Sequence, residues 1–92
     1  MLIVKTPNQL GAVLRGTRTA LNLPAADVAA MAGTSAVTLR RMEDGNATRT
    51  VRKLFALLEE LGIEMHLAPP PQVGTIDLPA PAAKPRRTRV RP

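Results

Sequence analysis

A short polar and basic segment, residues 35–41, holds the side chains best suited to recognise another molecule. An arginine can donate two hydrogen bonds to guanine O6 and N7, and an apolar side chain can contact a thymine methyl group. Serine and threonine hydroxyls can bond to a base or to a phosphate. We therefore predict a DNA-reading face made of Ser35, Ala36, Val37, Thr38, Arg40 and Arg41.

Two alternatives stay open within this segment. On so short a helix, one of Arg40 and Arg41 can face solvent or a phosphate in place of a base edge. Val37 can lie partly in the core. Neither alternative changes the predicted element, which is a helix with a basic outer face.

Two helices joined by a tight turn must position this segment. We predict the first over about residues 24–32. The second, capped by Thr34 or Ser35, is predicted to continue to about residue 44. Gly33 suits the turn because glycine adopts a positive φ at little steric cost. Ala29 is small where the helices would cross, while Leu39 and Met42 lie three residues apart and are expected to cover the first helix. A basic second helix after such a turn is the arrangement that enters a major groove.

Two more helices and two short strands complete the predicted domain, residues 1–68. One helix begins at the Thr6 cap and ends near Asn22, with Gln9 completing a capping box. The other begins at Thr48 or Thr50 and ends at Gly62. Residues 2–4 are apolar and β-branched, and residues 63–67 alternate apolar and polar, so both predict strands. The fold class expected is therefore mainly α, with four helices.

Residues 69–92 differ in composition and are predicted to be a proline-rich, basic, flexible tail. They hold seven of the nine prolines and five of the thirteen Lys and Arg residues, against one acidic residue, Asp77. Such proline density opposes helix and central strand. Residues 73–78 are its one apolar island and a candidate docking segment. The net charge of +6 favours a polyanionic partner.

Several function classes are not expected. The chain has no Cys and a single His, so we expect no thiol chemistry, metal site or cofactor, and no catalytic set is evident. His66 is interpreted as an exposed bystander, not a pH switch. No apolar run is long enough for a membrane span, and residues 1–5 lack a signal-peptide layout. We expect a non-enzymatic protein of the cytoplasm or nucleoid, with no membrane partner.

Basic and hydroxyl side chains on two helices are candidate phosphate contacts. Their alternative is a solvated helix face. The set is Arg15, Arg18, Thr48, Arg49, Thr50, Arg52 and Lys53.

Over about residues 8–62 the chain resembles the Xre/lambda-repressor-like helix-turn-helix family. The matching pieces are Leu10…Leu14-Arg15…Arg18, Val28-Ala29…Ala32-Gly33-Thr34-Ser35 and Leu39…Met42-Glu43-Asp44-Gly45. The resemblance implies an internal ion pair between Arg15 and Glu43. One departure is Pro24-Ala25, where the family usually has a Ser/Thr cap followed by Gln, so phosphate anchoring by that helix is in doubt.

Within this family, residues 57–67 look like the HipB-like antitoxins. That resemblance implies a strand that pairs with its copy across a homodimer, through Ile63, Met65 and Leu67. It also implies an autorepressing antitoxin of a type II toxin-antitoxin module, with operator DNA and a HipA-like kinase-type toxin as partners. The tail would contact the toxin, contact the DNA backbone or act as a degradation signal.

Two other functions remain open. One is a stand-alone Xre-type transcriptional regulator without a toxin partner. The other is a nucleoid-type protein without base readout, which the poor hydrogen-bonding capacity of Ala36 and Val37 favours.

Overall fold

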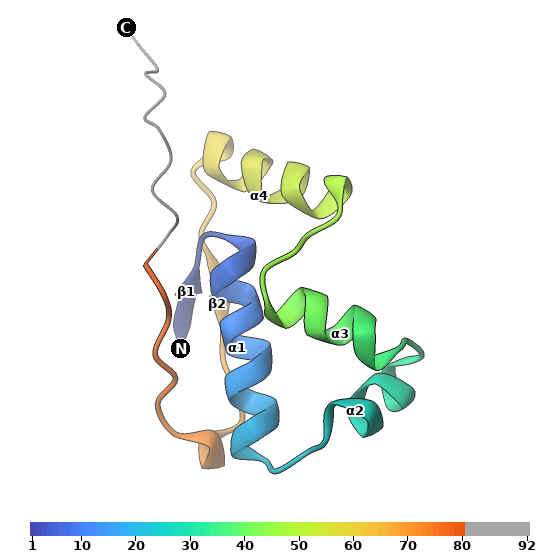
Figure 1. The fold of residues 1–92 in the computed structure, drawn as a ribbon. Coiled ribbons are helices and arrows are strands. Elements are labelled where there is room, and N and C mark those ends of the chain that lie inside the picture. Colours follow the sequence, from blue (N-terminus) through green and yellow to red (C-terminus); the bar gives the residue numbers. More distant parts are fainter. Residues whose placement is uncertain (81–92) are drawn as a thin grey trace, which may run out of the picture.

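Four helices and one two-stranded antiparallel sheet make up this mainly helical structure (Figure 1). The computed structural model describes residues 1–80, so the basic end of the predicted tail lies outside the described residues. The mainly α class with short strands is confirmed. In chain order the elements are β1 (Leu2–Val4), α1 (Pro7–Ala20), α2 (Ala25–Ala32), α3 (Ala36–Glu43), α4 (Arg49–Leu61), β2 (Met65–Leu67) and a 3₁₀ turn, η1 (Pro71–Val73).

Three helices begin at a hydroxyl side chain that accepts a hydrogen bond from the backbone N–H three residues later. These N-caps are Thr6, Ser35 and Thr48, with bonds of 3.1, 3.1 and 3.3 Å. Each satisfies one of the backbone donors that a helix start leaves free. The predicted cap at Thr6 is confirmed. Of the predicted pairs Thr34 or Ser35 and Thr48 or Thr50, the caps of α3 and α4 are Ser35 and Thr48. The capping box differs in detail, because Gln9 Oε1 accepts from the backbone N of Lys5 at 2.7 Å.

The helix ends also lie where left-handed backbone is tolerated. Asn22 has a φ of 57°, and Gly33 and Gly62 have φ values of 79° and 71°. Glycine, and less often asparagine, adopts this region at low cost. The three predicted helix ends are therefore confirmed.

The sheet joins the beginning of the described chain to the segment after α4. β1 pairs with β2 so that Leu2 lies opposite Leu67 and Val4 opposite Met65. The strand predicted over residues 63–67 forms only over its last three residues. Met65 and Leu67 pack against the protein's own core. Ile63 precedes the strand and is 52% exposed. The pairing of this strand with a second copy stays a prediction.

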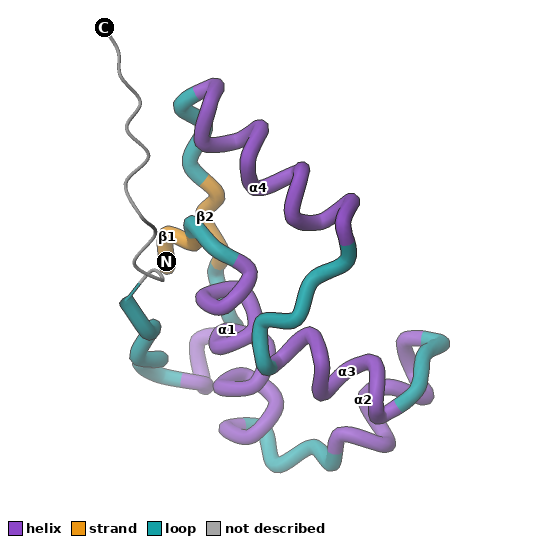
Figure 2. The backbone as a smooth tube through the Cα atoms, turned by 45° about the horizontal axis from the view of Figure 1, so that its top comes forward, coloured by secondary structure: helices purple, strands orange, loops and turns teal. Residues whose placement is uncertain are grey.

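Two small apolar clusters form the core. The first has Val4, Val13 and Phe55 at its centre and lies between the sheet, α1 and α4. The second is formed by Ala25, Ala29 and Leu39, where α2 packs on α3. In Figure 1 and Figure 2, α2 and α3 lie together below α4, which extends away from them.

Met42 corrects one packing prediction. Its side chain is 48% exposed and does not cover α2 as Leu39 does. The inner position at the end of α3 is occupied by Glu43, which is 5% exposed. Leu39 and Glu43 stand at i and i+4, so both lie on the inward face of α3, and Met42 lies at the margin of that face.

The segment after β2 does not leave the domain at residue 69. It turns at η1 and runs back beside α1 (Figure 1). We call residues 73–79 the strap. Leu78 of the strap packs against the first core cluster. The apolar island predicted as a docking segment therefore contacts the chain's own domain.

Candidate nucleic-acid interface

The tight connection between α2 and α3 determines how α3 is presented. Gly33 caps α2 in the left-handed conformation, and its backbone N–H bonds to Ala30 O at 3.2 Å. Nothing lies within 4 Å of a Cβ built on this residue. The backbone φ, and not crowding, is therefore the reason that glycine suits this turn. Ala29 is 1% exposed beneath Leu39, so the two helices approach closely.

The outward face of α3 carries three exposed side chains in one row. Val37, Arg40 and Arg41 stand at i, i+3 and i+4, which is one side of a helix. Val37 is 60% exposed, so it does not lie in the core, which was the alternative prediction for this residue. In the described part of the chain, neither arginine forms an ion pair with a carboxylate. Two guanidinium groups are thus available to an external acceptor.

The other predicted contacts on α3 are less available. Ser35 Oγ accepts from Thr38 N at 3.1 Å and lies 3.0 Å from Thr38 Oγ1, so both hydroxyls take part in the cap. Thr38 and Ala36 are half-buried. Ala36 lies three residues before Leu39 and so borders the inward face. The structure therefore brings together Val37, Arg40 and Arg41, while the other three predicted residues lie at the edge of that row.

The inward face of α3 is fixed by a buried ion pair. Arg18 donates from Nε to Glu43 Oε2 at 2.6 Å and from Nη2 to Oε1 at 3.0 Å. The Glu43 side chain is only 1% exposed. Arg18 also donates to Leu23 O at 3.0 Å, so one side chain joins α1, the α1–α2 connection and α3. Such two-pronged pairing fixes geometry as well as charge.

The ion pair predicted between Arg15 and Glu43 is present, with Arg15 Nε 3.9 Å from Glu43 Oε1, although the Arg15 side chain is 59% exposed. Arg15 also lies 3.7 Å from Asp44. The shorter, two-pronged contact comes from Arg18, and it corrects the prediction that Arg18 contacts a phosphate, because its charge is neutralised inside the fold. Arg18 lies nearly one turn farther along α1, where it reaches both Glu43 and the α1–α2 connection.

Hydrogen bonding to Glu43 raises the pKa of Arg18 above its ordinary value. Because the pKa of Arg18 is raised, the stabilisation that its charge gives to the fold is present at every pH below the ordinary pKa of arginine. This stabilisation is lost only when the pH rises through the raised pKa. The Arg18 charge therefore holds α3 at all physiological pH values.

The predicted phosphate contacts on α4 form an exposed basic group. Arg49, Thr50, Arg52 and Lys53 are all exposed and lie within the first two turns. No carboxylate among residues 1–80 forms an ion pair with them. Thr50 is free of the capping role, which Thr48 fills. The group adds positive charge at the end of the α3–α4 loop.

Two glycines set the position of α3 against α1. A Cβ at Gly11 would clash with the carbonyl oxygens of Met42 and Glu43. Gly45, which belongs to the segment that carries the family resemblance, has a φ of 87°, and a Cβ there would lie 3.0 Å from Asn8 Cα and closer still to its side chain. Sequence reasoning missed Gly11, although a glycine inside an otherwise helical pattern often marks a close backbone approach.

The remaining described features add no second chemical site. His66 lies on the exposed face of β2, with Nε2 3.0 Å from Glu64 Oε1. Within residues 1–80 no three His, Asp or Glu side chains cluster as metal ligands do. No described helix has the length and apolar character that crossing a membrane requires.

The comparisons with known proteins supply no assignment. No protein-family model matches the chain, no curated protein matches it, and no solved structure matches it. The case for a function therefore depends on the residues and geometry described above.

Proposed function

We propose that this protein binds double-stranded DNA in a sequence-specific way, with α3 in the major groove, and that it acts as a transcriptional repressor. The observation that carries the proposal is the exposed row of Val37, Arg40 and Arg41. That row stands on a helix whose opposite face is held by Leu39 and by the Arg18–Glu43 pair. A rigid helix with unpaired guanidinium groups suits base recognition, because the donors need no reorganisation on binding.

Within this proposal the three side chains have different tasks. One of Arg40 and Arg41 donates two hydrogen bonds to a guanine, and the other contacts a second base or a phosphate. Val37 contacts a thymine methyl group. Arg49, Arg52 and Lys53 contact phosphates beside the groove and contribute affinity without sequence preference.

We further propose that the protein acts as a homodimer. Leu54, Leu57 and Leu61 lie at i, i+3 and i+7 on α4 and are 46%, 58% and 69% exposed. Ile63, predicted at the dimer contact, is exposed just beyond the same helix. A second copy would remove these apolar groups from water. Two copies would read half-sites roughly 34 Å apart, one helical turn of DNA.

Selection of bound duplexes from a random pool tests DNA recognition directly. We expect an enriched sequence with two related half-sites. On that sequence, Arg40→Ala or Arg41→Ala should cost about 1–3 kcal/mol of binding free energy and relax one base position. Arg52→Ala is the matched control, because loss of a phosphate contact weakens all duplexes alike. Equal losses on every sequence from Arg40→Ala and Arg41→Ala would favour the nucleoid-type function instead.

The narrower role of a HipB-like antitoxin is proposed from the resemblance of residues 57–67. In line with that proposal, a strand follows α4. Co-purification of the full chain with the product of a neighbouring kinase-like gene tests it. Absence of such a complex, with operator binding intact, would leave the stand-alone regulator as the proposal.

A further inference from the structure

The exposed row of α3 offers hydrogen-bond donors and methyl groups, and it lacks a carboxylate or amide acceptor. Arg40 and Arg41 carry only N–H donors. The Val37 side chain ends in methyl groups and is 60% exposed. Residues 35–43 contain no Asn, Gln or Asp, and the side chain of their one acidic residue, Glu43, is only 1% exposed. A base that is recognised through its own N–H group, at adenine N6 or cytosine N4, therefore finds no such partner on this row.

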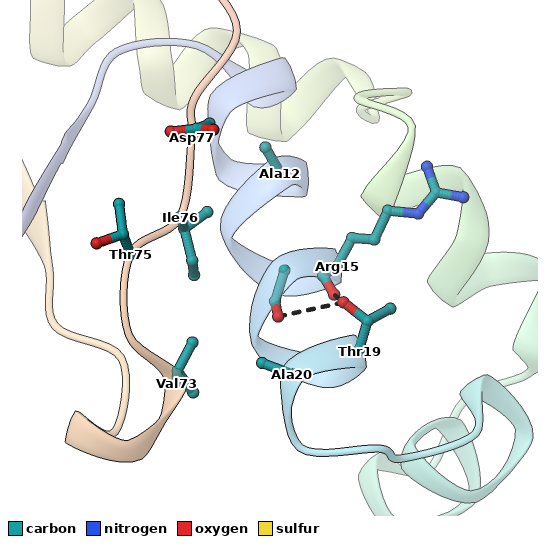
Figure 3. Close-up of a pocket in the computed structure, with 9 residues that line it drawn as sticks. Ala12, Arg15, Thr19, Ala20, Val73, Thr75, Ile76 and Asp77 are labelled. Carbon is teal, nitrogen blue, oxygen red and sulfur yellow. Dashed lines mark hydrogen bonds between the residues drawn. The ribbon is translucent and has the colours of Figure 1, made fainter.

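The acceptors that lie nearest to the row already have partners. Ser35 Oγ accepts from Thr38 N at 3.1 Å and lies 3.0 Å from Thr38 Oγ1. Asp44 follows the last residue of α3, and its Oδ1 lies 3.7 Å from Arg15 Nη1. Figure 3 shows the Arg15 side chain extending from α1 away from the strap. Because the first turns of a recognition helix contact the base edges, Asp44 lies at the end of α3 that is farther from them.

Two groups on the base edges of the major groove fit a row of donors and methyl groups. Guanine presents two acceptors, O6 and N7, to an arginine. A pyrimidine with a methyl group on C5 presents an apolar contact. Thymine always carries this methyl group, and cytosine carries it after methylation at C5. Both rings hold C5 at the same place in the groove, so 5-methylcytosine offers the row the same methyl group as thymine.

The spacing along α3 places these two contacts close together on the duplex. Arg40 and Arg41 follow Val37 by three and four residues. At roughly 1.5 Å per residue, the helix rises about 4.5–6 Å over this distance. Neighbouring base pairs are about 3.4 Å apart along the duplex. The methyl group and the guanine should therefore lie one or two base pairs apart.

We propose that α3 recognises the 5-methyl group of a pyrimidine beside a guanine, with thymine and 5-methylcytosine as alternative sources of that group, so that cytosine methylation of a site strengthens binding of this protein. The proposal rests on the proposed DNA binding and deepens it. Contact with the methyl group removes apolar surface of Val37 from water. One methyl-sized group corresponds to a roughly four-fold change in affinity. Unmethylated cytosine and uracil leave this contact unmade.

Two comparisons on the selected duplex each change a single methyl group. In the first, every thymine in turn is replaced with deoxyuridine, which keeps the hydrogen-bonding groups of the base. In the second, the T·A pair that responds is replaced with C·G, and duplexes with cytosine and with 5-methylcytosine are compared. For the full chain we expect uracil to weaken binding roughly four-fold at one position of each half-site, and methylation of the cytosine to strengthen it by a similar factor.

Variants of the full chain assign the methyl effect to one side chain. In Val37→Ala both methyl effects should shrink to about two-fold or less, because only Cβ remains to contact the methyl group. Met42→Ala is the matched control, since it shortens another exposed apolar side chain of α3 that lies outside the row. In that variant the roughly four-fold effects should persist. The difference between the two variants is a double-mutant cycle between protein and base.

Three results would overturn this proposal. The first is equal binding of thymine and uracil duplexes at every position. The second is a methyl effect at thymine without one at 5-methylcytosine, and the third is a methyl effect that persists in Val37→Ala. Failure of the proposed function looks different, because the full chain would then select no duplex, or Arg40→Ala and Arg41→Ala would leave binding unaltered.

Discussion

α3 and α4 both carry exposed basic side chains, but the chain holds them in different ways. α3 is fixed by Leu39 in one core, by the Arg18–Glu43 pair and by the close approach of α1 at Gly11. In α4 a single side chain, Phe55, is buried. The same helix leaves an apolar row from Leu54 to Leu61 exposed. The orientation of α3 is thus set by contacts within one chain. In contrast, α4 leaves an apolar surface exposed that a second chain could cover.

This difference corresponds to two requirements of the proposed function. A helix that contacts bases must be oriented before binding, because orientation fixes which donors meet which base edges. A helix that joins two copies needs only an apolar face that water disfavours.

Phe55→Ala should have the largest effect on stability. Phe55 is 7% exposed and is the one aromatic residue of the chain, so truncation leaves a cavity in the first core. We expect a loss of about 4 kcal/mol in the free energy of unfolding, measured by urea denaturation. Leu57→Ala on the same helix is the control and should cost far less at protein concentrations where the chain is monomeric. Similar losses for both would mean that α4 packs differently from this description.

Gly11→Ala should come next, at about 3 kcal/mol, because the added methyl group meets backbone carbonyls that cannot move without shifting α3. Gly16→Ala makes the same change one and a half turns along α1, where only the Ile76 side chain must adjust. Helix propensity favours alanine equally at both positions. A difference between the thermal midpoints of unfolding of the two variants therefore measures the effect of the close backbone approach at Gly11. Equal thermal midpoints for the two variants would show that Gly11 does not determine the position of α3.

Leu57→Glu should act on association and leave the fold intact. The change places a charge in the apolar row of α4, so we expect sedimentation to show a shift from dimer to monomer. Binding to a two-half-site duplex should weaken at least about ten-fold, because the second half-site is no longer tethered. Glu60→Gln, on the polar side of α4, is the control. A monomeric parent chain at high concentration would contradict the dimer proposed here.

Ser35→Ala should have the smallest effect, about 1 kcal/mol in the free energy of unfolding, because it removes the N-cap of α3. Thr34→Ala, one residue earlier, should change stability little, since Ser35 is the residue whose hydroxyl caps the helix. Circular dichroism during urea titration measures both. If Thr34→Ala costs as much as Ser35→Ala, the start of α3 lies one residue earlier.

Local signals made most of the fold predictable. The cap at Thr6 and the stops at Gly33 and Gly62 act within a few residues, so sequence spacing alone locates them. Spacing located the cap of α3 only to Thr34 or Ser35, and the structure has Ser35. The prediction that Arg40 and Arg41 are exposed on α3 used the same spacing. Their proposed role in DNA binding is still a prediction.

What the sequence did not reveal depends on contacts between distant residues. Arg15 and Arg18 are separated by less than one helical turn and both pair with Glu43, and only the path of α1 across α3 decides that Arg18 makes the short, two-pronged contact. The outward position of Met42 follows from the same crossing. The strap has no helical or strand periodicity, so its packing on α1 could not be inferred from pattern.

The pairing of β1 with β2 has a consequence for how the protein is made. Residues 2–4 are separated from their pairing partners, residues 65–67, by 60 residues of chain. Val4, the most deeply buried large side chain, therefore stays unpaired until residues 65–67 have also left the exit tunnel. Contacts between such distant residues form slowly. During synthesis this apolar end is exposed to chaperones, whereas α2 and α3 can associate as soon as both have left the exit tunnel.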